Sequence, residues 1–432
     1  MELKKSPNNK KIKIEDARLK ASVDRTLDDV DDELFVKKNK KHSSNTGFDK
    51  KSIAFLTTGI VGLIGGIACL VTGIMLPQGS TASLEFTRTS QGAQDNSTYS
   101  ILTGEPLADS SLRNAPVYCM QTPNGTDGAR PQAGLTEAGV VFEAIAEAGI
   151  TRFAAIYQNP SSSVIGPIRS LRIYFLDWDT PFDCTIVHAG GADDALAAVS
   201  SGGYKDLSED YAYMYRGTYG SRLWNNLFTT SAYLQKYSTD HGYTTSDIKG
   251  FARMTPAEST KAKVDAGAVE KLNITQATSV NTSEIKPTVD AIAINMGGFA
   301  DFNINYRYNP STNTYDRSYA SGAAHEVYKC GAEDLGEKNP EDVCELTQIS
   351  PSVVVAMIVQ EGISADGYHE SIGTTGTDDA YIFQNGTAIK GSWSKASKNE
   401  QIKFFDESGR EIALAPGQTF VTAVPAYGSV EY

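Results

Sequence analysis

The chain has 432 residues and a formal net charge of −13 at pH 7. A protein this acidic repels polyanions, so we expect no nucleic-acid partner. A hydrophobic content of 40% is enough for buried cores, and five cysteines are too few for a fold built mainly on disulfides. At this length we expect two folded units besides any segment that is not globular.

The first part of the chain predicts a membrane anchor. Residues 52–76 carry only small or apolar side chains and no charge, over a length that suffices for one helix across the bilayer. Residues 1–51 are rich in lysine and predict a disordered tail, whereas the first basic residue after the apolar run is Arg88. The positive-inside rule then predicts a single-pass protein of the cell membrane, with tail 1–51 in the cytoplasm and the C-terminal domains outside. A cleaved signal peptide is the alternative, but its polar leader would be unusually long.

A polar segment at residues 77–100 predicts a flexible linker to the external region. Residues 101–255 then mix strand and helix patterns, which predicts an α/β domain. Its predicted strands are Pro116–Met120, Ile150–Gln158 and Cys184–Val187. Its predicted helices are Val140–Gly149, with Thr136 as the N-cap, and Ala192–Ser200.

The remainder of the chain predicts a second, predominantly β domain at residues 288–432, after a polar connector at residues 256–287 that holds at most one helix. Its strongest strand patterns are the alternating run Phe302–Tyr308, the apolar run Val353–Val359 and a hairpin at Tyr381–Trp393. The Asn-Gly pair in this hairpin suits a type I′ turn. The whole chain is therefore predicted as a membrane-anchored α+β protein.

Four cysteines lie outside the apolar run. We favour a disulfide between Cys330 and Cys344, because the loop between them is short and polar, and this leaves Cys119 and Cys184 as a second pair. Buried free thiols are the alternative. The sequence has no Cys-x-x-Cys motif and no Cys/His cluster, and we predict neither a metal site nor a cofactor.

Three residues are candidates for acid–base chemistry. Glu143 and Glu147 are four residues apart on the predicted helix, which would place both carboxylates on one face. His188 ends an apolar strand before a Gly-Gly turn, a position where open α/β sheets bind ligands. The alternatives are a solvated or arginine-paired face for the two carboxylates, and a hydrogen-bonded structural role for the histidine.

Four arginines of the first external domain lie in apolar or turn contexts, and they are Arg130, Arg152, Arg169 and Arg172. If they converge, their planar guanidinium groups would form a pocket for a carboxylate or a phosphate. The alternative is that they pair internally with the acidic residues Glu143, Glu147 and Asp177.

Several stretches of the external region match one family in the same order. They are ARPQAGL from Ala129, FEAIAEAGITRF from Phe142, IGPIRSLRIYF from Ile165, VHAGGADDAL from Val187, LWNNLFT from Leu223 and IFQNGTAIKGSW from Ile382. With them the chain resembles the YerB-like family of bacterial envelope proteins, whose two domains have no known function. Members of the family are typically lipoproteins, whereas this chain is predicted to use an uncleaved helix.

The resemblance adds two candidates for ligand binding. The family's Pro-His-Asn run corresponds to Trp224, Asn225 and Asn226 in this chain. The family's Pro-His element corresponds to His325, with Ala324 in place of the proline. The resemblance therefore directs attention to Asn226 and His325.

These observations predict a tethered envelope protein that binds an anionic cell-wall component or another envelope protein through its arginines. The alternative is an envelope hydrolase or transferase that acts on wall glycan or peptide through Glu143, Glu147 or His188. A purely structural scaffold is a third hypothesis.

Overall fold

The computed structural model of the chain describes residues 98–218, 224–268, 287–332 and 337–432. All of them belong to one unit, Asp95–Tyr432. The predicted cytoplasmic tail, the predicted membrane span and nearly all of the predicted linker lie outside the described residues. Of the helices that the structure does describe, none has the length and apolar character needed to cross a bilayer.

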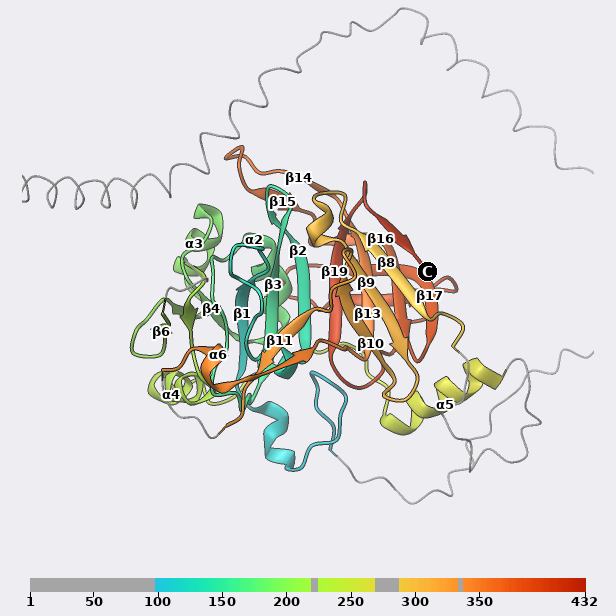
Figure 1. Cartoon of the computed structure of the whole chain (residues 1–432), viewed down its shortest axis with the longest axis horizontal. Coiled ribbons are helices and arrows are strands. Elements are labelled where there is room, and N and C mark those ends of the chain that lie inside the picture. The colour runs from blue at the N-terminus through green and yellow to red at the C-terminus, as the bar shows by residue number, and fades with distance from the viewer. Residues whose placement is uncertain (1–97, 219–223, 269–286, 333–336) are drawn as a thin grey trace, which may run out of the picture. The chain divides into compact units, whose positions relative to one another are not determined.

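A ten-stranded mixed sheet runs through the centre of this unit (Figure 1). From edge to edge its strands are β18 (Lys403–Asp406), β17 (Thr387–Lys395), β16 (Gly376–Gln384), β13 (Val353–Val359), β19 (Thr419–Pro425), β2 (Val140–Glu147), β3 (Ile150–Gln158), β1 (Val117–Pro123), β4 (Thr185–His188) and β5 (Lys205–Ser208). Strands β19 and β2, from the two predicted external domains, pair in parallel. Both segments therefore contribute to one continuous sheet.

Six of these strands run in the same direction. Strands β13, β19 and β2 are parallel to one another, and so are β1, β4 and β5. Strand β3 is antiparallel to both β2 and β1, so the two groups point the same way. Their carboxyl ends consequently lie along one edge of the sheet, which we call the carboxyl edge. Open α/β sheets commonly bind ligands at such an edge.

Helices cover both faces of the sheet around β1 and β4. Helices α2 (Ile173–Asp179) and α3 (Asp193–Ser200) lie on one face, where the ring of Trp178 stacks on Phe142 at 5.4 Å. Helix α4 (Ser231–His241) lies on the other face and buries Leu234. The predicted connector contains helix α5 (Pro256–Ala268), and its residues 269–286 lie outside the described part of the chain.

A second sheet covers β13, β16 and β19 (Figure 1). It lies on the same face of the large sheet as α4, opposite α2. Its strands are β10 (Thr314–Tyr319), β9 (Ile304–Asn309), β8 (Ala291–Asn295) and β20 (Ser429–Glu431). Three two-stranded sheets lie outside these two sheets, and they are β6 (Tyr215–Arg216) with β7 (Leu227–Phe228), β11 (Glu326–Lys329) with β12 (Glu345–Gln348), and β14 (Glu361–Ile363) with β15 (Glu370–Ile372). A short helix, α6 (Pro340–Val343), precedes β12. The α+β class and the mostly β character of the C-terminal half are confirmed.

One element of the first domain was predicted wrongly. The segment Val140–Gly149, expected to be a helix, forms strand β2 and its turn. Val140, Phe142 and Ala144 pack beneath α2, and Val141 and Ile145 pack on the opposite face, so both faces are buried. A strand buried on both sides has no polar alternation, and its pairing with β3 and β19 outweighs the helix propensity of Ala and Glu.

Local signals elsewhere agree with the structure. The hairpin β16–β17 turns at Asn385 and Gly386, whose φ values of 55° and 72° are those of a type I′ turn. Disulfides join Cys119 to Cys184 and Cys330 to Cys344, the same pairing that the sequence favours.

Candidate functional site

The four predicted arginines lie on two faces of the sheet. Strand β2 has an irregular register between Ile145 and Glu147. A bulge of this kind reverses the direction of the side chains that follow it. Glu143 therefore points towards β10, whereas Glu147 points towards the start of α2. Arg130 belongs to the Glu143 side, and Arg152 and Arg172 belong to the Glu147 side.

Glu147 lies between two guanidinium groups. Its Oε1 accepts a hydrogen bond from Nη2 of Arg152 at 2.7 Å, and its Oε2 accepts one from Nη2 of Arg172 at 2.8 Å. Burial raises the pKa of Glu147, but the two arginine charges outweigh it and the pKa lies below its ordinary value. For Arg152 and Arg172 the structure thus shows the internal pairing that the sequence left as an alternative.

Arg169 adds a third positive charge beside this cluster. Its backbone N–H donates to the carbonyl of Gln121 on β1, and its own carbonyl accepts from Ala189, just after β4. Arg169 therefore lies at the carboxyl edge, between the ends of two parallel strands. Among the residues that the structure describes, nothing forms a hydrogen bond or an ion pair with its half-buried guanidinium.

The negative charges near Arg169 do not offset the effect of burial and of the neighbouring arginines on its pKa. Burial lowers the pKa of Arg169, and Glu147 and Asp127 raise it by less than this. The positive charges of Arg172 and Arg216 lower the pKa further. Because its net pKa lies below the usual value, the cation at this position would be stabilised by an additional anion.

Arg216 is a further arginine of this edge, and no periodicity or motif in the sequence singles it out. It lies at the end of β6 and is exposed, with Glu209 as its ion-pair partner. Its Nη1 donates to Oδ1 of Asn226 at 3.0 Å. Asn226 is itself fully buried, so it orients Arg216 and does not face solvent. We call Arg152, Arg169, Arg172 and Arg216, together with Glu147, the arginine corner.

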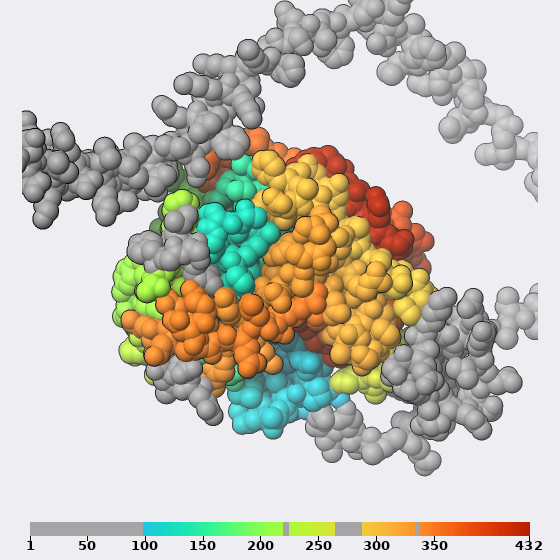
Figure 2. Space-filling view, viewed as in Figure 1, coloured from blue at the N-terminus to red at the C-terminus, as the bar shows by residue number. Residues whose placement is uncertain are grey.

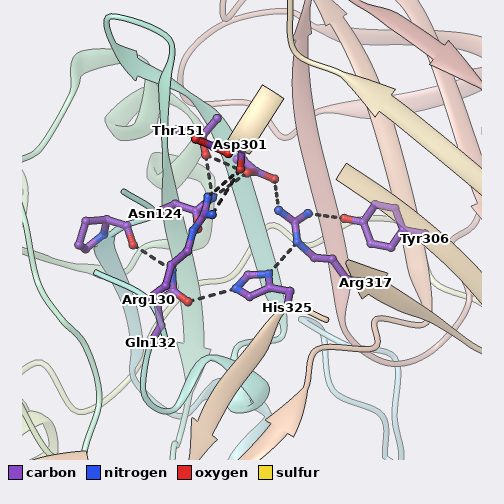
Figure 3. Close-up of polar contacts among 10 residues, drawn as sticks. Asn124, Arg130, Gln132, Thr151, Asp301, Tyr306, Arg317 and His325 are labelled. Atoms are coloured by element: carbon purple, nitrogen blue, oxygen red, sulfur yellow. Dashed lines mark hydrogen bonds and ion pairs between the residues drawn. The ribbon is translucent and has the colours of Figure 1, made fainter. Parts of the chain in front are cut away.

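A second polar cluster lies buried on the opposite face of the sheet (Figure 3). Arg317 of β10 donates from Nη2 to Oε2 of Glu143 at 2.9 Å, and neither side chain is exposed to solvent. Its Nη1 donates to the hydroxyl of Tyr306 at 2.6 Å, and its Nε donates to Nδ1 of His325 at 2.8 Å. The sequence could have indicated Arg317, because it occupies an inward position between two tyrosines in an alternating strand.

The hydrogen bonds fix the state of His325. Since Arg317 can only donate, Nδ1 of His325 carries no proton, and Nε2 donates to Oε1 of Gln132 at 3.1 Å. Burial lowers the pKa of His325 well below its usual value, and the charges of Arg317 and Arg130 lower it further. His325 is a buried, neutral support for Arg317, and the structure places it away from the arginine corner.

Arg130 closes the same network at its half-buried end. Its Nε donates to Oδ1 of Asn124 at 2.9 Å, and its guanidinium lies 4.0 Å from the ring centre of Tyr319 and 5.1 Å from that of Phe302. It also donates to the carbonyl of Asp301. These contacts satisfy Arg130 within the protein.

His188 has a partner at each ring nitrogen. Its Nδ1 lies 2.7 Å from the carbonyl oxygen of Gly190, and its Nε2 lies 2.9 Å from Oδ1 of Asp206 on β5. The side chain is 1% exposed. Its position at the end of β4 is as expected, but these contacts match the structural role that the sequence left open.

The carboxyl edge carries a carboxyl pair that sequence reasoning missed. Glu361 begins β14 directly after β13, and Glu370 begins β15. The two side chains hydrogen-bond to each other, and the hydroxyl of Tyr427 donates to Glu361 at 3.1 Å. Burial raises the pKa of Glu361 to about 7. In the described part of the chain, no set of His, Cys, Asp or Glu side chains is grouped to bind a metal ion.

Comparison with known proteins identifies the family. Residues 102–244 match the N-terminal domain of a protein of unknown function, DUF3048, and residues 293–421 match its C-terminal domain. A Bacillus subtilis (strain 168) protein named "Putative lipoprotein YerB" is 26% identical over 305 residues, which cover 70% of this chain and 79% of that protein. The crystal structure of YerB from Bacillus subtilis is similar in fold, with a TM-score of 0.59 and 21% identity, and the match covers 78% of this chain and 100% of that one.

Proposed function

This chain belongs to the YerB-like family of two domains of unknown function, and from that premise we propose that it is a cell-envelope protein that binds an anionic ligand at the arginine corner. The name of the matched relative, "Putative lipoprotein YerB", supports a place in the envelope. Residues 52–76 would supply the anchor of this chain, with the described unit on the outer side.

The observation that carries the proposal is the guanidinium of Arg169 at the carboxyl edge, which has no hydrogen bond or ion pair with any residue that the structure describes. An arginine that is half-buried without a partner is costly, because it has lost part of its hydration and has gained no hydrogen bond in return. Here the neighbouring arginines increase that cost. A bound anion would remove it.

The ligand chemistry follows from the guanidinium group. Its planar set of donors matches two oxygens of a carboxylate or a phosphate, and partial burial strengthens such a contact relative to open water. In the envelope, carboxylates occur on wall peptides and phosphates occur on wall polymers. The corner keeps Arg152 and Arg172 paired with Glu147, and it pairs Arg216 with Glu209. Among the described residues of the corner, Arg169 is therefore the arginine that can bind a ligand without breaking an ion pair.

The hydrolase or transferase hypothesis gains no specific support from the described geometry. Glu143 and Glu147 point to opposite faces of the sheet, and each is bound to an arginine. His188 is held by Asp206 and Gly190. A binding role therefore accounts for more of the arrangement.

Binding measurements on the full-length protein test the proposal. We expect purified muropeptides, poly(glycerol phosphate) or inorganic phosphate to bind, and Arg169→Ala to weaken this binding. Loss of a charge-assisted hydrogen bond costs about 1.5–3 kcal/mol, which is roughly tenfold to a hundredfold in Kd. Arg307→Ala, at an exposed arginine of β9, is the matched control and should bind as the unaltered protein does. Equal binding by the Arg169 and Arg307 variants would contradict the proposal.

A further inference from the structure

A cavity of about 460 Å³ opens at the opposite edge of the ten-stranded sheet, where β2, β13 and β19 begin and β3 ends. This volume is in the range of small-molecule sites. One wall comes from the first described segment of the chain, drawn in cyan at the end of the molecule away from hairpin β14–β15 (Figures 1 and 2). The cavity is therefore separate from the arginine corner.

The lining of this cavity is polar and carries only negative charge. It includes Glu105 and Glu137 but no lysine, arginine, histidine or aromatic residue. Glu137 is held in place because its Oε2 accepts hydrogen bonds from the backbone N–H and the hydroxyl of Ser161. Its Oε1 and the carboxylate of the exposed Glu105 accept no hydrogen bond from the described residues, although the charge of Glu105 also acts on Arg253.

Three glutamines place hydrogen-bond acceptors, their side-chain amide oxygens, in the lining. Each uses its side-chain NH2 group on main-chain carbonyls, which sets the orientation of its amide. Gln158 donates to Leu112, Arg113 and Ala115, Gln348 donates to Arg317, and Gln418 donates to Leu135 and Ala138. No described residue donates a hydrogen bond to their Oε1 atoms. None of these three oxygens is fully buried, so each is open to solvent.

The chemistry that fits this lining is a hydrogen-bond donor with positive charge. An ammonium group has three donors and no acceptor, and it matches carboxylate and amide oxygens. An anionic ligand would be repelled by Glu105 and Glu137. A neutral sugar would find no aromatic ring on which to stack.

We propose that this cavity is a second binding site, for a ligand that carries a primary ammonium group. The ammonium would be bound by Glu137, Glu105 and the oxygens of the glutamine amides. It could come from a diamino-acid side chain of a peptide or from an amino sugar. The site is independent of the proposed anion site, since the two lie at opposite edges of the sheet.

The experiment is a titration of the full-length protein with three probes: Nα-acetyl-lysine methylamide, glucosamine and N-acetylglucosamine. Saturation-transfer NMR reports binding of each probe. We expect one or both amines to bind and N-acetylglucosamine, which lacks the ammonium, to bind at least about tenfold more weakly. Preference for the lysine derivative indicates a peptide ligand, and preference for glucosamine indicates an amino sugar.

Two variants assign the binding to the cavity. Glu137→Gln should weaken amine binding by about tenfold or more. Glu105→Gln, at an exposed carboxylate with no described hydrogen bond to lose, should weaken it in the same direction, and Glu407→Gln on the exposed loop after β18 should leave it unchanged. The proposal is overturned if neither amine binds, if N-acetylglucosamine binds as well as they do, or if both cavity variants bind like the Glu407 variant.

Discussion

The buried pair of Glu143 and Arg317 makes the sharpest prediction about stability. It links the segments matched by the two family domains, and neither side chain has exposed surface. Glu143 accepts hydrogen bonds from Asn124 and Thr151 on Oε1 and from Arg317 on Oε2. Substitution by glutamine keeps the shape but supplies only one acceptor oxygen. Its NH2 group must then face a donor, whichever way the amide turns.

The expected cost follows from the uncompensated charge. Removing one partner of a buried ion pair destabilises a protein by about 3–5 kcal/mol. We therefore expect Glu143→Gln to lower the free energy of unfolding of the full-length protein by that amount in urea or guanidinium titrations. The double variant Glu143→Gln with Arg317→Met should be less destabilised than Glu143→Gln alone, because the stranded charge is gone. A loss below about 1 kcal/mol, the range of an exposed pair, would refute this reasoning.

The other predictions concern charge, pH and cross-linking. Burial raises the pKa of Asp179 well above its usual value, so the fold binds a proton there that the unfolded chain loses above about pH 4. Stability should fall as pH rises from that point through the folded pKa, and Asp179→Asn should raise the free energy of unfolding at pH 8 and flatten this dependence in denaturant titrations. Glu147→Gln should tighten phosphate binding in calorimetry, because two arginines lose their counter-ion. The same substitution should lower the free energy of unfolding by about 1–3 kcal/mol. Weaker phosphate binding by this variant would argue against an anion site. Replacing both Cys330 and Cys344 by serine opens a loop with a sequence separation of 14 residues and should cost about 3 kcal/mol in urea unfolding.

Local sequence signals predicted those parts of the fold that depend on local chemistry. The Asn385-Gly386 turn and the apolar run of β13 were found because turn geometry and β-branched composition are properties of short segments. Strand β2 was mistaken for a helix because its burial on both faces depends on layers built by distant residues. The parallel pairing of Thr419 with Val140 joins residues that are far apart in the chain, and no local pattern encodes it.

In the site, too, local sequence indicates some features, whereas others depend on the assembled fold. The arginines were identified from their unusual contexts, yet their grouping depends on the register irregularity beside Glu147, which reverses the side chain relative to Glu143. Arg152 forms an ion pair, whereas Arg169 forms none within the described part of the chain, and this difference is a property of the assembled edge of the sheet. Sequence alone could state both possibilities and could not choose between them.

The most direct test of the proposed anion site is a crystal of the protein soaked in tungstate, a phosphate-like anion with strong anomalous scattering. We predict an anomalous peak within hydrogen-bonding reach of the Arg169 guanidinium, and its disappearance in Arg169→Ala crystals. A peak that persists in that variant, or tungstate bound elsewhere while Arg169 stays empty, would contradict the proposal.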